Sequence, residues 1–155
     1  MIKRDKIVDF LNTTLNIDKI NDYSINGLQV DGCENINKIG FAVDLSLNTI
    51  NAAIEKKIGM LIVHHGIFWK NSPITLTGIH KQRAYLLLAN NISVYAAHLP
   101  LDLHNKYGNN IQICKILGLT NIKSFGFYNG INIGYYGELK KQTEFSKFID
   151  LFSKK

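Results

Sequence analysis

Apolar residues along this chain fall alternately into short runs and into stripes of helical period. Residues 38–43, 60–63 and 93–97 are short, largely apolar runs, as expected of buried strands. The segments between them, 47–57 and 80–90, repeat apolar residues at helical spacing, and Ser46 is a suitable N-cap for the first of these helices. The order strand, helix, strand predicts parallel strands joined by right-handed crossovers.

The flanking segments add helices and a hairpin to this pattern. Amphipathic spacing predicts helices over residues 4–15, 108–117 and 143–152. Residues 23–32 predict a short strand between two turns. Residues 124–138 alternate around Asn129-Gly130, which indicates a tight hairpin and makes the sheet mixed. We therefore predict an α/β fold, a mostly parallel mixed sheet with helices on its faces, as a single domain over residues 1–155.

Composition excludes several classes of protein. The chain has 155 residues, of which 46% are hydrophobic and 19% charged, values close to those of ordinary globular domains. No apolar run approaches the ~20 residues of a membrane span, and the first ten residues lack the apolar region of an export signal. We expect a cytoplasmic protein that has no membrane partner.

The net charge of +6 raises the question of an anionic partner. The basic residues are scattered along the chain, without an aromatic-interleaved stripe or a known nucleic-acid motif, so a solvated basic surface is favoured over nucleic-acid binding. Cys33 and Cys114 are too isolated for a disulfide scaffold or a paired-cysteine zinc site, which favours reduced thiols.

The candidate chemistry begins at residues 60–69, MLIVHHGIFW, where a buried strand leads directly into two histidines. Neighbouring side chains on a strand point to opposite faces, so His64 and His65 can contact one ligand only if the strand bends or ends between them. Gly66 makes such an ending inexpensive. Two adjacent metal ions, one for each histidine, suit the spacing better. The alternative is one hydrogen-bonded histidine at the sheet end and one solvated histidine.

Two other predicted strands end in polar residues as well. Asp44 follows the first strand, where it is either a site residue or a turn former, and His98, Asp102 and His104 follow the third. Parallel strands bring such ends side by side. Imidazole and carboxylate groups are ligands for Zn, Mn, Fe or Ni, so the sequence predicts a divalent-metal site at this edge.

The loop from Gly66 to Thr77 is long for a strand-to-helix connection and carries Phe68, Trp69 and Pro73. These residues either wall a pocket or cap the core, and the core role is favoured.

Three ordered motifs resemble those of the YbgI-like family of GTP cyclohydrolase 1 type 2 homologues. They are NGLQVDG at residues 26–32, HHGIFW at 64–69 and HLPLDLHNKYGNN at 98–110. The resemblance implies a dinuclear metal centre in which His64 and His65 each ligate one ion and Asp102 ligates one of them. It also implies a homo-oligomer, commonly a toroidal hexamer. By its place at the strand end, His98 is expected to support a metal ligand or to contact the substrate, so we place His98 as the candidate catalytic residue.

The chain resembles the N-terminal part of that family, whose members are longer. The family's further ligands, a histidine and a bridging glutamate, have no counterpart among these residues. We therefore predict a divalent-metal-binding protein with a partial dinuclear site, which holds clearly fewer than two ions per chain. The alternative is a metal-dependent hydrolase acting on a nucleotide-like or phosphoester substrate, and a third reading is a fragment whose site is incomplete.

The last predicted helix carries the apolar stripe Phe145, Phe148, Ile149 and Phe152. The stripe either packs on the sheet or leaves an exposed patch that drives self-association, so Phe148→Asp is expected to raise solubility if the stripe is exposed.

Overall fold

The computed structural model describes residues 1–72 and 75–153, with side chains described up to residue 150. The chain divides into two compact units, unit 1 (Met1–Pro100) and unit 2 (Leu101–Lys155). The assignment of residues 1–155 to a single domain stays a prediction. Across the described residues, every helix is too short or too polar to span a membrane.

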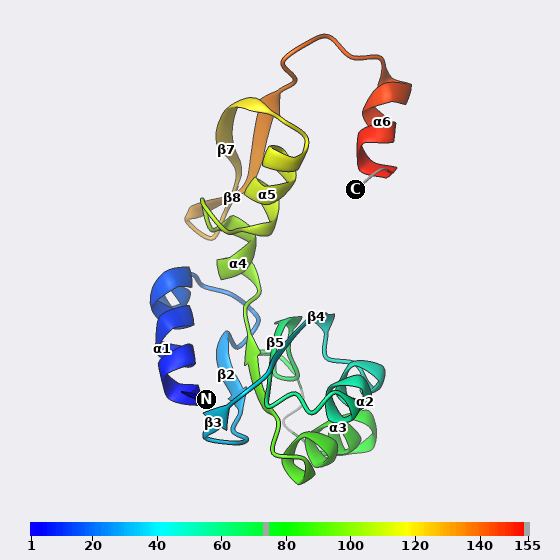
Figure 1. Ribbon diagram of the computed structural model, residues 1–155. Helices are drawn as coiled ribbons and strands as arrows, with labels where there is room; N and C mark the ends of the chain where they lie inside the picture. Colours follow the sequence, from blue (N-terminus) through cyan, green and yellow to red (C-terminus); the bar gives the residue numbers. More distant parts are fainter. Residues whose placement is uncertain (73–74, 154–155) are drawn as a thin grey trace. The chain divides into compact units, whose positions relative to one another are not determined.

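Unit 1 alternates strands with helices, as the apolar pattern predicts (Figure 1). Ser46 caps α2 by accepting a hydrogen bond from the backbone N–H of Thr49, so this predicted helix start is confirmed. The elements of unit 1 in chain order are β1 (Ile2–Lys3), α1 (Arg4–Leu15), the 3-10 helix η1 (Ile17–Lys19), β2 (Gly27–Val30), β3 (Asn35–Ile36), β4 (Ile39–Asp44), α2 (Leu47–Glu55), β5 (Met60–His65), α3 (Gly78–Ala89) and β6 (Ser93–Ala96).

A four-stranded sheet with the order β2-β6-β5-β4 forms the centre of unit 1. β4 and β6 both run parallel to β5, with Ala42 and Ala96 each opposite Val63. β2 pairs antiparallel with β6, and this strand makes the sheet mixed. The carboxyl ends of β4, β5 and β6 therefore meet at one edge, as predicted.

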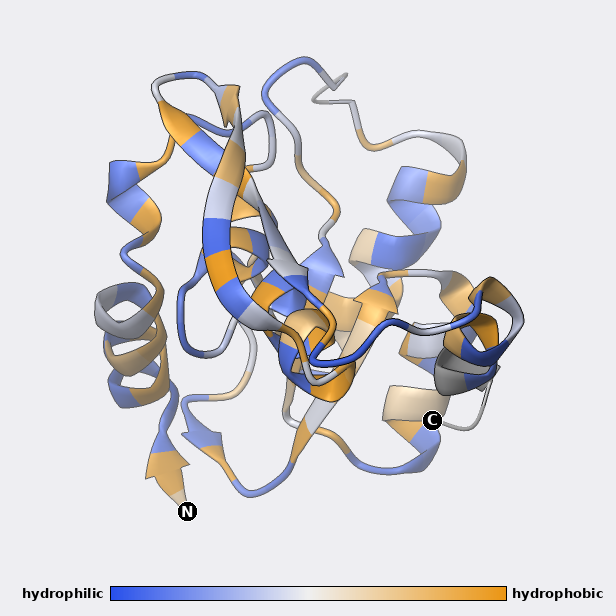
Figure 2. Cartoon of the chain, turned by 90° about the horizontal axis from the view of Figure 1, so that it is seen from above, coloured by the Kyte–Doolittle hydropathy of each residue, from blue (hydrophilic) through white to orange (hydrophobic). Residues whose placement is uncertain are grey.

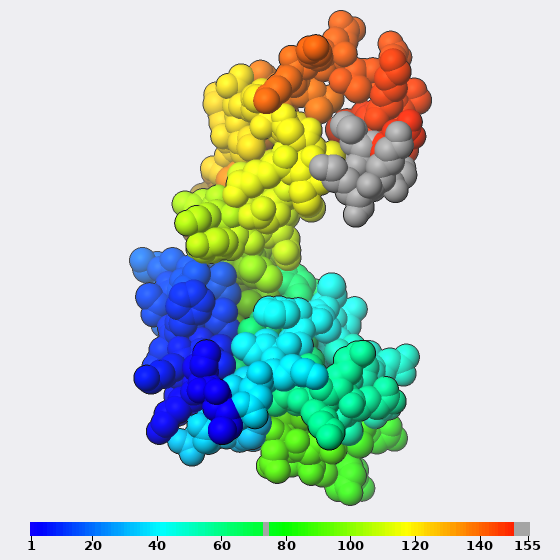
Figure 3. All heavy atoms as spheres, viewed as in Figure 1, coloured from blue at the N-terminus to red at the C-terminus, as the bar shows by residue number. Residues whose placement is uncertain are grey.

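The sheet is covered on both faces. Leu61, Val63, Val94 and Ala96 pack with buried residues of α2 and α3 in one hydrophobic cluster. Tyr95 points to the opposite face, where its buried hydroxyl donates to Asn12 Oδ1 of α1 at 2.9 Å. In Figure 2, α1 beside the labelled N-terminus shows hydrophobic and hydrophilic residues in alternating bands, and in Figure 3 its blue atoms lie at the surface of the unit. α1 is thus an amphipathic covering helix.

Unit 2 consists of a helix and a hairpin followed by a final helix. Asn129 and Gly130 have φ of 46° and 92°, as the predicted tight turn requires. Among the described strands the hairpin forms a two-stranded sheet of its own, so the prediction that it makes the main sheet mixed is wrong. The elements are α5 (Asn109–Ile116), β7 (Thr120–Tyr128), β8 (Ile131–Glu138) and α6 (Phe145–Ser153); the short helix α4 (Leu99–Leu103) contains the boundary between the units.

Candidate metal centre

Three histidines converge at the carboxyl edge of the sheet in unit 1. His64 and His65 come from the end of β5, and His98 follows β6 by two residues. The ring centroid of His64 lies 4.6 Å from that of His65 and 4.9 Å from that of His98. One ring nitrogen from each residue lies within 4.8 Å of the other two, so the three side chains form a group that could hold a metal ion.

The two neighbouring histidines converge although β5 does not end between them. Pairing with β6 stops at Val63, whereas pairing with β4 continues to His65 opposite Asp44, so the last residues of β5 are paired on one side only. β5 continues through His64 and His65, so the strand does not end between them, and a bend there stays a prediction.

Each histidine of the cluster directs its Nδ1 atom at an oxygen. His64 Nδ1 lies 2.9 Å from the carbonyl oxygen of Ala97, and His65 Nδ1 lies 2.7 Å from a carboxylate oxygen of Asp44. His98 Nδ1 lies 2.9 Å from a carboxylate oxygen of Asp22. A carbonyl or carboxylate oxygen accepts only, so each Nδ1 carries the proton and each Nε2 carries the lone pair in the neutral ring.

Asp22 is a buried carboxylate that organises His98 and its surroundings. Only 3% of Asp22 is exposed, and its oxygens accept hydrogen bonds from His98 Nδ1, the Asn26 side chain and the backbone N–H groups of Ser24 and Leu99. Burial alone would raise the pKa of Asp22, but these four hydrogen bonds outweigh it and lower the pKa below its ordinary value. Asp22 is therefore an anion at neutral pH.

Asn26 completes this support, since its side-chain oxygen accepts from the backbone N–H of His98 at 2.7 Å. Sequence reasoning treated Asn26 as a turn former and missed Asp22 entirely. Asp22 and His98 are 76 residues apart, so no local spacing connects them. The only available signal was the position of Asp22 four residues before the NGLQVDG motif.

Gln29 fixes the loop that follows the two histidines. Its side-chain oxygen accepts from the backbone N–H groups of Ile67 at 2.7 Å and Phe68 at 3.1 Å, and its amide nitrogen donates to the Phe68 carbonyl. A Cβ atom on Gly66 would collide with this amide group. A side chain at position 66 would therefore displace the Gln29 amide from the loop, and this close approach adds to the predicted role of Gly66 at the end of β5.

The two described aromatic residues of the loop take different roles. Phe68 packs against the hydrophobic cluster, which confirms the core role for that residue. Trp69 instead lies at the site, with its ring centroid 5.1 Å from His98 and 5.8 Å from His65, so the core role is wrong for Trp69. Pro73 lies outside the described residues.

Asp102 and His104 belong to unit 2. Asp102 lies on α4 and accepts a hydrogen bond from the Asn109 side chain at 2.9 Å. His104 Nδ1 accepts from the backbone N–H groups of Lys106 and Tyr107, and its ring stacks on Tyr107. Metal ligation by Asp102 stays a prediction. Asp44, whose role the sequence left open, lies beside His65 at the site.

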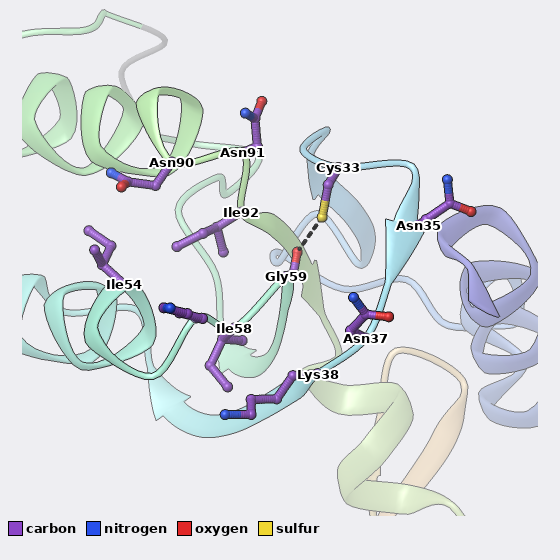
Figure 4. Close-up of a pocket in the computed structure, with 11 residues that line it drawn as sticks. Cys33, Asn35, Asn37, Lys38, Ile54, Ile58, Gly59, Asn90, Asn91 and Ile92 are labelled. Carbon is purple, nitrogen blue, oxygen red and sulfur yellow. Dashed lines mark hydrogen bonds between the residues drawn. The ribbon is translucent and has the colours of Figure 1, made fainter. Parts of the chain in front are cut away.

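A hollow of about 350 Å³ at the opposite, amino edge of the sheet is remote from the histidines (Figure 4). Two polar side chains of this hollow already have partners: the Lys38 ammonium donates to the Lys56 carbonyl, and the Cys33 thiol, which points at Gly59 in Figure 4, donates to its carbonyl oxygen. The histidine edge is therefore the stronger candidate for chemistry.

Sequence comparison now places the chain in a family. The profile of Duf34/NIF3 (NGG1p interacting factor 3) matches residues 2–155. The chain belongs to the DUF34/NIF3 family. Its DUF34/NIF3 relatives include proteins named GTP cyclohydrolase 1 type 2 homolog, which confirms the predicted resemblance.

The DUF34/NIF3 relative from Pyrococcus horikoshii is 45% identical over 152 residues, which are 98% of this chain and 60% of the relative. The one from Pyrococcus abyssi is 41% identical over 154 residues, 99% of this chain and 61% of the relative. The chain thus spans about 60% of the length of these relatives.

Solved structures confirm the α/β fold. The protein ybgI, described as of unknown function, is 39% identical with a TM-score of 0.76, and the match covers 80% of this chain and 50% of that one. Reduced HcgD from Methanocaldococcus jannaschii is 28% identical with a TM-score of 0.84, and the match covers 99% of this chain and 60% of that one.

Proposed function

We propose that this DUF34/NIF3 chain binds a divalent metal ion through His64, His65 and His98. The proposal rests on the geometry of the cluster: one ring nitrogen of each histidine lies within 4.8 Å of the other two, and each Nδ1 atom faces an oxygen acceptor. Metal-binding histidines in proteins characteristically donate their other ring N–H to a carbonyl or a carboxylate in this way.

The spacing of the histidines fits an ion after a small adjustment. A tetrahedral ion with metal–nitrogen bonds of about 2.0–2.1 Å holds its ligand nitrogens about 3.4 Å apart. The ring nitrogens lie within 4.8 Å of one another, so closing the cluster on an ion needs movements of about 1.4 Å or less. Imidazole nitrogens suit Zn, Fe and Ni. Mn is the fourth candidate ion, because it suits carboxylate ligands.

The finer assignments are proposals as well. The site is a partial dinuclear centre in which Asp102 is a further ligand, as the family resemblance implies. With three histidines in the cluster, the 155-residue chain is expected to hold fewer than two ions.

A zinc titration of metal-free protein by calorimetry tests the proposal. Alanine substitution of His64, His65 or His98 is expected to weaken zinc binding at least about tenfold, because each removes one ligand. His80→Ala is the matched control, since His80 lies on α3 outside the cluster. Asp102→Ala, titrated in parallel, tests ligation by Asp102. Zinc binding that is unchanged in all three cluster variants would refute the proposed site.

The second candidate function is a metal-dependent hydrolase that acts on a nucleotide-like or phosphoester substrate. The observation that favours it is a pocket beside His65 that Trp69 and Arg83 help to line. A bound divalent ion supplies Lewis-acid activation there. In this role His98, the predicted catalytic residue, contacts the substrate. Turnover of GTP or of simple phosphoesters by metal-loaded protein, absent in His65→Ala, supports this candidate; equal rates in both proteins contradict it.

A further inference from the structure

A pocket of about 310 Å³ opens directly beside the histidine cluster in unit 1. It has one cationic and one large aromatic side chain among its walls, the guanidinium of Arg83 from α3 and the indole of Trp69. The complete lining is Asp44, Leu45, His65, Gly66, Trp69 and Arg83.

Arg83 is the unusual member of this lining. Its Nε atom is buried, yet among the described residues it has no hydrogen-bond partner, and no ion pair there joins Arg83 to an acid. A buried donor without a partner is costly, so a water, an ion or a ligand is needed to supply the missing acceptor. Asp44 lines the same pocket, but its carboxylate faces His65 Nδ1 at 2.7 Å.

We propose that this pocket binds a small planar-ring molecule that carries an oxyanion. The planar guanidinium of Arg83 contacts the oxyanion, because its N–H groups match the geometry of phosphate and carboxylate oxygens. Trp69 contacts the ring of the ligand, because its flat indole already forms one wall. The inference extends the proposed metal site by placing an anionic ligand next to His65, and its test does not require a metal.

The single tryptophan of the chain makes the pocket directly observable. Metal is removed from the 155-residue protein with a chelator, the chelator is removed by dialysis, and Trp69 fluorescence is followed while phenyl phosphate, benzoate or phenol is added. Phenyl phosphate, benzoate or both should give a saturable change, and neutral phenol should bind at least about tenfold more weakly. The first two probes distinguish a phosphate from a carboxylate ligand.

Variants on one helix separate the pocket from general charge. Arg83→Gln should weaken binding of the preferred anion at least about tenfold, and Arg83→Lys should give an intermediate loss, because it keeps the charge without the planar fork. Lys81→Gln removes a positive charge from an exposed position of α3 that does not line the pocket. This variant should therefore bind the preferred anion with wild-type affinity.

Several results would overturn the inference. These are the absence of a saturable signal with either anion, equal affinity for phenol, or wild-type affinity in Arg83→Gln or Arg83→Lys. The variants are compared with wild type by circular dichroism and thermal unfolding, and Arg83→Lys provides the decisive comparison if Arg83→Gln does not fold. A zinc titration of the Arg83 variants tests the metal site separately, so the two proposals can fail independently.

Discussion

Asp22 is the residue on which the orientation of His98 depends. Its carboxylate accepts the Nδ1 proton of His98, which leaves Nε2 as the ring nitrogen that can ligate a metal ion. Asp22→Asn should lower zinc affinity about 10- to 100-fold while the ligand residues remain, as is typical for partners of metal-binding histidines. Calorimetric zinc titration of Asp22→Asn tests this. Asp18→Asn is the matched control, since Asp18 carries an exposed carboxylate on η1. Equal zinc affinity in both variants would show that Asp22 does not position His98.

The same carboxylate makes stability depend on pH in metal-free protein. Because folding lowers the pKa of Asp22 below its ordinary 3.8, the ionised group stabilises the folded state above that pH, and this contribution is lost as the pH falls through the lowered value. At neutral pH, Asp22→Asn should lower the free energy of unfolding by about 1.5–3 kcal/mol. Urea unfolding of both proteins should show this gap shrinking below pH 4. A gap that widens there would contradict the assignment.

Residue-level prediction from sequence succeeded where a pattern was local and failed where it was not. Two histidines at the end of an apolar run, and a third after another run, indicated the cluster because parallel strands align their ends. Asp22 and Arg83 were not predicted as site residues, because an isolated acid or arginine has no periodicity. Only the folded chain shows that Asp22 is buried against His98 and that Arg83 lines a pocket.

At the scale of elements, the segment after β5 depends on one side chain of β2. Gln29 satisfies the backbone N–H groups of both Ile67 and Phe68. Gln29→Leu should lower the free energy of unfolding by about 1–3 kcal/mol for each N–H group left buried without a partner. It should also weaken zinc binding, because the loop begins directly after His65. Urea unfolding and zinc titration measure the two effects.

Gln82→Leu is the matched control for Gln29→Leu, since Gln82 is exposed on α3. Its stability should stay within about 0.5 kcal/mol of wild type. If the two variants were equally stable, Gln29 would not fix the loop.

Element boundaries were largely predictable because each has a local cause. Ser46 caps α2, and the paired positive φ values of Asn129 and Gly130 form the hairpin turn. The partner of the hairpin was not predictable, because alternation along a strand indicates which face is apolar and not which strand lies alongside. The antiparallel β2 was also beyond prediction, since pairing with β6 is a long-range choice.

At the scale of the whole molecule, the apolar stripe of α6 bears on self-association, which we propose for this chain. Phe145 is 76% exposed and Ile149 is 46% exposed, whereas Phe148 is half-buried; the side chain of Phe152 lies outside the described residues. Phe145 is therefore a sharper test than Phe148. Phe145→Asp should shift sedimentation of the chain toward monomer, because it places a charge in an exposed apolar patch.

Ser146→Asp adds the same charge at the next position, which is also exposed and outside the stripe, and should leave sedimentation unchanged. A wild-type chain that sediments as a monomer at all concentrations would contradict self-association. Equal shifts in the two variants would show that net charge, and not the stripe, controls it.

The ion content of the protein tests the metal site most directly. The 155-residue chain is purified without a metal-affinity tag, equilibrated with zinc, dialysed and measured by elemental analysis, beside a variant with alanine at His64, His65 and His98. We predict on the order of one zinc ion per wild-type chain, clearly fewer than two, and almost none in the triple variant. Two tightly held ions per chain would contradict the partial site, and equal zinc in the two proteins would contradict the histidine cluster as a metal centre.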